Sequence, residues 1–280
     1  MSTPTASVMV PTRNRAGYLA VTLASLATQR LDAPYEVLVV DDGSTDGTPA
    51  VAERSGFAYT RHRRQRGPNA ARNTGIAASR APLIALVDDD VRAPCGWLAA
   101  LLEGAERHAW ADVLGGPIRA SLEGPAPGAC GRESPPLTTL DLGVDDRETD
   151  FVWSANMAMR RGAVERLGGF DEDVPIYGDE EEWLARLHAV GGRVAYIAAA
   201  GLEHRRAGAD ARLRALARAE YRRGRAARAS DLRKGGAPTP TRELRNLAGA
   251  GWHTVRRRCP QGLIMGAHSA GRLTEALRSA

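Results

Sequence analysis

Two clusters of carboxylates could form a metal-binding or a catalytic site. An acidic triplet, Asp88 to Asp90, directly follows the apolar run 82–87, and four carboxylates in a row occupy positions 179–182. Carboxylate oxygens suit Mg²⁺ and Mn²⁺, and a carboxylate can act as a general base. Each cluster also has an ordinary explanation, since a triplet after a strand is most often a solvated turn, and acidic residues favour the start of a helix. Capping does not easily explain four carboxylates in a row.

A third acidic motif, Asp41-Asp42-Gly43-Ser44, follows the apolar run 36–40. Taken alone, it is best explained as a turn in which Asp42 caps a helix that begins near Thr48. Its position after a predicted strand is nevertheless the same as that of the triplet.

The elements that must position these residues alternate along the chain. Hydrophobic patterning predicts strands over 6–11, 36–40 and 82–87, and helices over 18–26, 48–54 and 69–79. Such alternation indicates an α/β fold with a largely parallel sheet and helices on both faces. Because ligands bind at the carboxyl ends of the strands in these sheets, the acidic motifs are expected on one edge.

The second half of this region is less regular. Residues 117–150 are rich in Gly, Pro and charge, which predicts a long loop or irregular crossover with a short strand. Order returns at 151–160, and the later pattern predicts helices over 163–167 and 179–190 and a last strand over 193–199.

Four motifs occur in an order that resembles the family 2 glycosyltransferases. They are Val10–Arg15, Val40–Ser44, Asp88–Asp90, and Gly168–Asp171 ahead of Gly178–Glu181. The resemblance covers about residues 6–205. It implies the GT-A nucleotide-diphospho-sugar transferase fold, a Rossmann-like mixed sheet flanked by helices, over a catalytic domain 1–205. It also implies a hexosyltransferase-type enzyme that inverts the sugar it moves from a nucleoside diphosphate to an acceptor hydroxyl.

The resemblance assigns a metal-binding role to the acidic triplet. In the family this is the DxD motif, where Mg²⁺ or Mn²⁺ bridges carboxylates and the donor diphosphate. It implies that Asp90 binds the metal, that Asp88 lies near the donor ribose or a metal-bound water, and that Asp89 belongs to the donor site. His204, which follows the last predicted strand, matches a metal-binding histidine of many GT-A enzymes; a structural role for it is the alternative.

Donor-binding residues follow from the same resemblance. It implies that Asp42 accepts a hydrogen bond from the nucleobase, with uracil or thymine favoured, and that Pro11, Thr12 and Arg13 form the other side of the base pocket. Arg72 is the candidate for binding the diphosphate, because its guanidinium offers a fork of donors. The alternative for Arg72 is an ordinary arginine on a helix surface.

The general base is expected among the carboxylates at 179–182. The family pattern is a Glu-Asp pair followed by an acidic residue and an apolar helix, whereas this chain reads Asp-Glu-Glu-Glu-Trp. Counting back from Trp183 makes Glu180 the best match, with Asp179 next. A shift of one residue would select Glu181 instead.

Two other classes of function compete with this interpretation. A sugar nucleotidyltransferase normally carries a glycine-rich loop after its first strand, and residues 10–15 contain no glycine. A non-catalytic nucleic-acid-binding protein is suggested by a pI of about 9.5. No helix-turn-helix, zinc-finger or aromatic-basic motif supports it, so no nucleic-acid partner is expected.

The positive charge is concentrated in the C-terminal part of the chain. Residues 205–280 hold 18 of the 38 basic residues and 5 of the 33 acidic ones, which puts this segment near +13 and the rest near −8. It is predicted to be an Arg-rich, mainly helical extension over 206–280. Two uses remain open: peripheral contact with anionic lipid, or a helical extension that packs on the catalytic domain or forms a homodimer.

Cysteine usage and hydropathy indicate the cellular compartment of the protein. Cys95, Cys130 and Cys259 show neither CxxC spacing nor an even count, which argues against a disulfide framework or a zinc site. No apolar run approaches the roughly 18 residues that cross a bilayer, and the first residues lack a secretory pattern. A cytoplasmic protein with reduced thiols, at most peripheral at the inner face of the membrane, is therefore expected.

Overall fold

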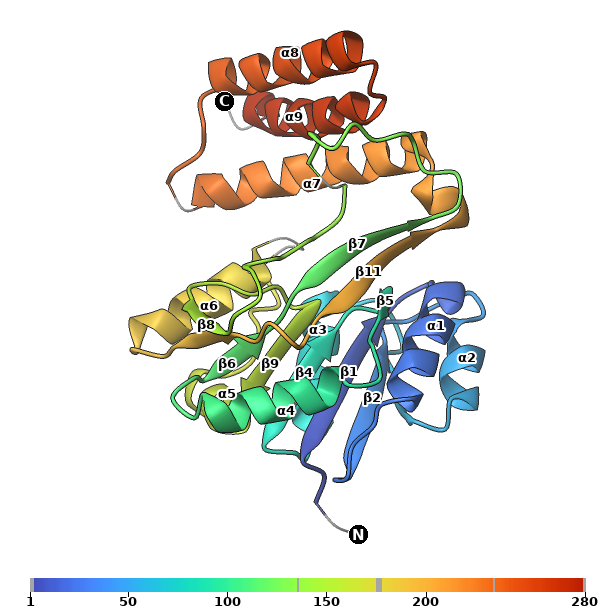
Figure 1. The fold of residues 1–280 in the computed structure, drawn as a ribbon, viewed down its shortest axis with the longest axis vertical. Coiled ribbons are helices and arrows are strands. Elements are labelled where there is room, and N and C mark those ends of the chain that lie inside the picture. Colours follow the sequence, from blue (N-terminus) through green and yellow to red (C-terminus); the bar gives the residue numbers. More distant parts are fainter. Residues whose placement is uncertain (1–2, 135, 175–177, 234, 279–280) are drawn as a thin grey trace. The chain divides into compact units, whose positions relative to one another are not determined.

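The computed structural model describes residues 3–134, 136–174, 178–233 and 235–278 (Figure 1). The chain forms two compact units. The first consists of residues 1–120, 138–174 and 179–204, and the second of residues 121–137, 175–178 and 205–280. Each unit is described by itself below.

The first unit is built on an eight-stranded mixed sheet. Its strand order is β3-β2-β1-β4-β9-β6-β10-β8. The strands are β1 (Ala6–Thr12), β2 (Tyr35–Asp41), β3 (Ala58–Arg61), β4 (Leu83–Val87), β6 (Val113–Gly115), β8 (Arg147–Thr149), β9 (Asn156–Arg160) and β10 (Val194–Tyr196). Strands β1 to β4 run parallel to one another, and β9 runs antiparallel to both β4 and β6. The predicted mixed α/β sheet is thus confirmed.

Helices cover both faces of this sheet. They are α1 (Ala16–Ala27), α2 (Thr48–Arg54), α3 (Pro68–Ala78), α4 (Trp97–Arg107), α5 (Arg161–Leu167) and α6 (Asp179–Ala189). Val8 and Val10 of β1 belong to the core shared with α1 and α4, whereas Met9 belongs to the core shared with α3, α5 and α6. Successive residues of a strand point to opposite faces. A strand buried on both faces therefore reads as the continuous apolar run seen in the sequence.

The strand register brings the acidic motifs to one edge, as expected. Thr12 pairs with Asp41 at the carboxyl ends of β1 and β2, and the Asp42 amide donates to the Thr12 carbonyl over 2.9 Å. Strand β4 ends at Val87, directly before the acidic triplet. Because β9 is antiparallel to β4, with Val87 opposite Asn156, the residues just before β9 reach the same edge.

The structure corrects two expectations for the chain beyond residue 117. The segment 117–150 contains two strands, β7 (Ile118–Glu123) and β8, rather than one short strand. The strand over 193–199 is not the last, because β11 (Leu202–Ala207) follows it in a three-stranded sheet of order β5-β11-β7, with β5 at Val91–Arg92. The sequence of β11, LEHRRA, has no apolar alternation, so backbone pairing rather than side-chain pattern defines this strand.

The second unit contains a short 3₁₀ helix, η1 (Gly208–Ala211), and the helices α7 (Leu213–Arg233), α8 (Pro240–Arg257) and α9 (Gln261–Arg278). Helices α7 and α9 approach closely at two glycines. A Cβ atom at Gly224 would meet the His268 carbonyl, and one at Gly271 would meet the Tyr221 carbonyl. The helical C-terminal region predicted from the sequence is therefore present. Among the helices of the described residues, none has the length and apolar character needed to cross a membrane.

Candidate active site

The acidic triplet lies at the carboxyl end of β4, with Asp88 half-buried and Asp89 and Asp90 buried. One side-chain donor atom from each of Asp88, Asp90 and His204 lies within 4.8 Å of the donor atoms of the other two. His204 Nε2 is 3.1 Å from Asp90 Oδ1. Strand β11 delivers His204 to this place, because His204 pairs with Val91 of β5, the residue that follows Asp90.

The donor set of this cluster fits a divalent cation. His204 Nδ1 lies 3.2 Å from the Thr138 carbonyl, which can only accept a hydrogen bond. The proton of a neutral imidazole is therefore held on Nδ1, and Nε2 keeps the lone pair that a metal needs. Two carboxylates and one imidazole are a donor set that Mn²⁺ accepts, and the carboxylates also suit Mg²⁺.

Arg15 neutralises part of the charge of the triplet. Its guanidinium lies 3.0 Å from Asp89 Oδ1 and 2.7 Å from Asp90 Oδ2. Burial raises the pKa of Asp89 to about 7, against the opposing charge of Arg15. Burial and the neighbouring charge of Asp90 also raise the pKa of Asp88. Arg15 ends the motif Val10–Arg15, and nothing in that local pattern indicates its contact with the triplet.

The three residues expected beside the nucleobase follow one another at the end of β1. Pro11 is half-buried, Thr12 is buried and Arg13 is exposed. The Thr12 hydroxyl donates to Asp89 Oδ2 over 2.7 Å. Thr12 therefore connects the end of β1 with the acidic triplet, whereas Arg13 is the member of this group with an accessible side chain.

Asp42 organises the loop that follows β3. One of its oxygens accepts the Arg66 amide and the other the Gly67 amide, both over 2.8 Å. His62 Nδ1 also lies 2.8 Å from Asp42 Oδ1, and His62 Nε2 lies 3.0 Å from the Thr74 hydroxyl. No local pattern around His62 indicates this contact, because β3 lies between Asp42 and His62 in the sequence.

The carboxylates at the start of α6 differ in their surroundings. Asp179 and Glu180 are buried, whereas Glu181 and Glu182 are half-buried. Glu182 forms an ion pair of 2.6 Å with Arg186, one helical turn later. The buried side chains of Trp183, Leu184 and Leu187 fix the helix against the sheet. Two of the four carboxylates thus point inward from a rigid element.

Of the two buried carboxylates, Asp179 and Glu180, Glu180 has the larger shift in pKa. Its Oε1 accepts the Ser154 hydroxyl over 2.5 Å and the Ser154 amide over 3.3 Å. Burial and the adjacent charge of Asp179 raise the pKa of Glu180 to about 8. Ser154 precedes β9 and reaches this edge through the antiparallel pairing with β4. Nothing in the local sequence around Ser154 signals this role.

Arg72 lies inside the protein and contacts the carboxylate pair. From α3, its guanidinium donates to Asp179, to Asn69 Oδ1 over 2.8 Å and to Ser154 Oγ over 2.8 Å. Although burial acts in the opposite direction, the charge of Arg72 lowers the pKa of Asp179. Arg72 is therefore a buried partner of Asp179 in this structure. Its expected role at the diphosphate stays a prediction.

Comparison with known proteins gives one family. The model of Glycosyl transferase family 2 matches residues 7–168, more than half of the chain. The pre-mycofactocin glycosyltransferase of Mycobacterium tuberculosis is 32% identical over 210 residues, which cover 71% of this chain and 43% of that protein. The validoxylamine A glucosyltransferase of Streptomyces hygroscopicus subsp. jinggangensis is 30% identical over 221 residues, covering 67% of this chain and 52% of that protein. The chain thus spans about half the length of these curated relatives.

Solved structures share the fold. The mannosyltransferase PcManGT from Pyrobaculum calidifontis, in complex with GDP-Man and Mn²⁺, matches with a TM-score of 0.60 and 21% identity, covering all of this chain and 74% of that one. TarS from S. aureus matches with a TM-score of 0.58 and 20% identity, covering 77% of this chain and 38% of that one. Both likenesses concern the GT-A fold.

Proposed function

Since the chain belongs to glycosyl transferase family 2, we propose that it transfers a sugar from a nucleoside diphosphate to an acceptor hydroxyl with inversion. Residues 1–205 would carry the catalytic machinery. The observation that carries the proposal is the state of Glu180, a buried carboxylate held by Ser154 with a pKa of about 8. A general base works best when its pKa lies near the operating pH.

The mechanism places the proton of the acceptor on Glu180. A hydroxyl is a poor nucleophile at neutral pH, so a base must take its proton as it attacks the anomeric carbon. The bond to the diphosphate breaks on the opposite face, which inverts the configuration in a single displacement. Ser154 orients the Glu180 oxygen, and Arg72 keeps Asp179 ionised beside it. Arg72 and Ser154 thus act as positioning residues for the base.

The departing diphosphate requires positive charge at the triplet. Asp90 and His204 would hold Mg²⁺ or Mn²⁺, with Asp88 completing the cluster. When bound, such a cation neutralises the charge that grows on the leaving group. Support comes from the donor set of the cluster and from PcManGT, which was solved with GDP-Man and Mn²⁺. Arg15 contacts Asp89 and Asp90 and would limit the repulsion between these carboxylates before the cation binds.

The donor base would lie beside the ends of β1 and β2. Pro11, Thr12 and Arg13 line one side, and Asp42 fixes the loop on the other through the amides of residues 66 and 67. Asp42 would then receive a hydrogen bond from the base. The resemblance to the family favours uracil or thymine as that base. We expect residues outside this pocket to select the sugar and the acceptor.

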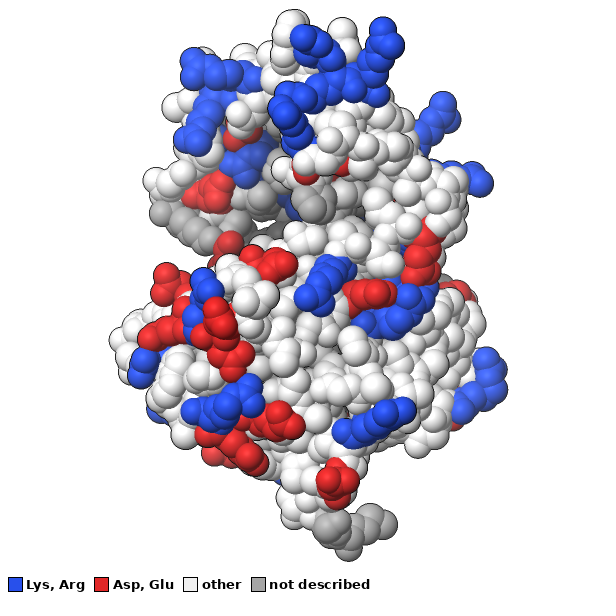
Figure 2. Space-filling model, viewed as in Figure 1, with Lys and Arg blue, Asp and Glu red and all other residues white. Residues whose placement is uncertain are grey.

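The second unit offers a surface suited to anionic lipid. Helix α8 exposes Leu244, Trp252 and Val255 to 52%, 67% and 76%, and at 100° per residue these three lie within one quarter of the helix circumference. Exposed arginines flank this stripe, namely Arg242, Arg245 and Arg256, and basic side chains gather over the C-terminal helices (Figure 2). An apolar stripe with a tryptophan beside basic residues is the pattern of a helix that lies in a membrane interface. Peripheral contact with an anionic bilayer is the use of this region that we favour.

A direct assay tests the enzymatic proposal. Purified protein is incubated with UDP, dTDP and GDP sugars with and without Mn²⁺, and release of the nucleoside diphosphate is measured. Glu180→Gln should lower turnover by about 10²- to 10⁴-fold while donor affinity changes little. Glu181→Gln is measured in parallel, because a shift of one residue would make this half-buried carboxylate the base. A near-normal rate for Glu180→Gln would move the base to another residue, and a retained anomeric configuration by NMR would refute the single displacement.

A further inference from the structure

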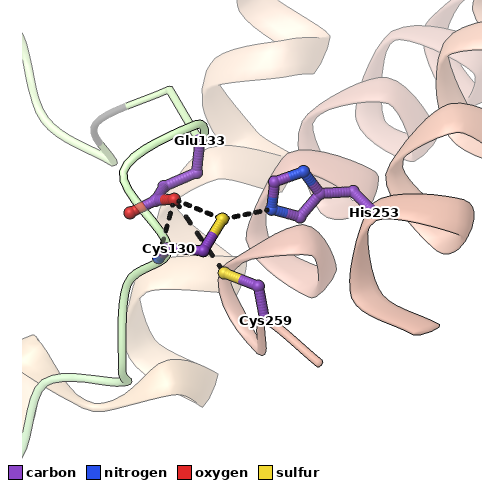
Figure 3. A group of neighbouring side chains, drawn as sticks. All are labelled: Cys130, Glu133, His253 and Cys259. Carbon is purple, nitrogen blue, oxygen red and sulfur yellow. Dashed lines mark hydrogen bonds between the residues drawn. The ribbon is translucent and has the colours of Figure 1, made fainter. Parts of the chain in front are cut away.

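Four side chains with metal-binding atoms converge within the second unit (Figure 3). Cys130 and Glu133 come from the segment 121–137, His253 lies on α8, and Cys259 follows the end of that helix. One donor atom of each lies within 4.8 Å of the donor atoms of all the others. None of the four belongs to the candidate active site.

Three of the six separations between the donor atoms are close to the edges of a small tetrahedron. Cys130 Sγ lies 3.2 Å from Glu133 Oε2 and 3.4 Å from His253 Nε2, and Cys259 Sγ lies 3.9 Å from Glu133 Oε2. Tetrahedral Zn²⁺ takes sulfur at about 2.3 Å and nitrogen or oxygen at about 2.0–2.2 Å, which sets the ligand edges at about 3.5–3.8 Å. These three separations lie within about 0.4 Å of such edges, and the other three pairs of donor atoms lie within 4.8 Å.

The backbone on both sides turns to present these atoms. Arg258 has a left-handed conformation with φ of 51°, and the Cys259 amide donates back to the Thr254 carbonyl over 3.2 Å. This turn returns Cys259 to the last turns of α8, where His253 lies. On the other side Gly131, with φ of 75°, turns the chain between Cys130 and Glu133. A non-glycine residue is uncommon in the left-handed region, so the turn at Arg258 is held by its surroundings.

We propose that Cys130, Glu133, His253 and Cys259 bind one Zn²⁺ in a closed, four-coordinate structural site. Each thiol gives up its proton to solvent and binds as a thiolate, so no electron is transferred. Thiolate and imidazole select zinc over Mg²⁺ and Mn²⁺, the ions suited to the carboxylates of the active site. The site therefore differs from the triplet cluster in its donors and in the ion it takes.

The ion would fix the segment 121–137 onto the helices of its own unit. Ser134 and Pro136, just beyond Glu133, line a cavity of about 530 Å³ whose remaining wall includes Asn246 of α8 and Ile264 of α9. In this structure the segment is held near this point by the Cys130 and Arg132 amides, which donate to Glu133 Oε2, and by the Gln261 side chain, which donates to the Pro127 carbonyl. Zinc would thus hold one wall of the cavity in place.

The spacing of the three cysteines does not predict a zinc site, because it takes no account of glutamate and histidine ligands. Zinc sites are read from short spacings such as CxxC, whereas here each pair combines a cysteine with a different ligand type. Cys130 and Glu133 have two residues between them, and His253 and Cys259 have five. The two pairs meet only because the segment 121–137 folds back against α8. A disulfide between Cys130 and Cys259, both free in this structure, is the competing fate of the same thiols.

Metal binding by the full chain tests the proposal. Protein purified under reducing conditions is stripped of metal, refilled with Zn²⁺ alone and dialysed, and its zinc is measured by elemental analysis. About one Zn²⁺ per chain is expected, and substitution by Co²⁺ should give the thiolate charge-transfer and tetrahedral ligand-field absorption. Cys130→Ser and His253→Gln should each lose the tightly held ion. Cys95→Ser is the matched control, because Cys95 is an exposed cysteine outside the group, and Asp90→Asn shows that the active-site cluster does not hold this zinc.

Because Cys130 is exposed, we expect the Cys130→Ser variant to fold. Thermal unfolding of each variant verifies that it is folded. A zinc content in Cys130→Ser equal to that of the wild type and of Cys95→Ser, or no retained zinc in the wild type, would overturn the proposal. So would a Cys130–Cys259 disulfide found by peptide mass analysis in protein kept under reducing conditions. Loss of zinc from the Cys130 and His253 variants with unchanged folding would support it. None of these readouts depends on glycosyl transfer, so the zinc site and the proposed function can fail separately.

Discussion

Ser154 donates its hydroxyl proton to Glu180 over 2.5 Å, and its own oxygen accepts a hydrogen bond from Arg72. A residue two positions before an antiparallel strand thus connects an arginine of α3 with a carboxylate of α6. The hydrogen bond from Ser154 stabilises the ionised form of Glu180 and opposes the rise in pKa that burial causes. Ser154 is therefore expected to tune the base as well as to orient it.

Replacing Ser154 by Ala should shift the pH profile of the transfer reaction. Because the lost hydrogen bond favoured the carboxylate form, the pKa of Glu180 should rise and the rate at pH 7 should fall. The rate of Ser154→Ala should recover in part at higher pH, where Glu180 loses its proton. The measurement is kcat/KM from pH 6 to pH 10 for this variant and for Ser55→Ala, a half-buried serine at the end of α2. An unshifted profile with a uniformly lower rate would show that Ser154 only supports the local structure.

Glu180 should also make the folded state less stable as pH rises. Its pKa is about 8 in the folded protein against an ordinary value of 4.5, so the folded state binds the proton more tightly. The resulting stabilisation is complete below about pH 4.5 and is lost as pH rises toward 8. Glu180→Gln stays neutral at every pH. The Tm of this variant should therefore rise relative to that of the wild type as the pH increases from 5 to 9. A constant difference in Tm across this range would contradict the raised pKa.

Removing one ligand of the triplet cluster should abolish the response to metal. Asp90→Asn keeps the size of the side chain but replaces a charged ligand by a weak neutral one. We expect turnover that no longer increases with Mn²⁺ at concentrations that saturate the wild type. Asp173→Asn, an exposed aspartate, serves as the control. Full metal-dependent turnover in Asp90→Asn would refute the assignment of this cluster.

Exposed apolar residues of α8 should govern binding to anionic vesicles. The double variant Trp252→Ser and Val255→Ser removes most of the stripe, whereas Val144→Ser with Val190→Ser removes two valines exposed elsewhere to 89% and 58%. In sedimentation with phosphatidylserine-containing vesicles, the first pair should release the protein and the second should not. High salt should weaken binding of the wild type, because the flanking arginines contribute through charge. No binding at low salt would refute the membrane proposal, and a wild-type dimer that is lost in the α8 variant would assign this surface to self-association.

The sequence by itself determined the sheet and the edge at which the acidic motifs after β2 and β4 lie. Continuous apolar runs such as 82–87 specify strands buried on both faces, because a strand without alternation cannot expose a side. Acidic residues directly after such runs must lie at the carboxyl edge of a parallel sheet. The carboxylates at the start of α6 were likewise found from local pattern, since apolar residues at helical spacing follow them. These features are local, and short-range stereochemistry encodes them.

Only the tertiary structure decided which side chains meet. Ser154 reaches Glu180 because β9 runs antiparallel to β4, and Arg72 turns inward to Asp179 because α3 packs on the same face of the sheet as α6. His204 reaches Asp90 through a polar strand that has no side-chain signature. Cys130 meets Cys259 through the folding of a segment without periodicity. Each of these contacts depends on the direction of a strand or the path of a loop, which long-range backbone pairing and burial fix and which no local pattern of residues records.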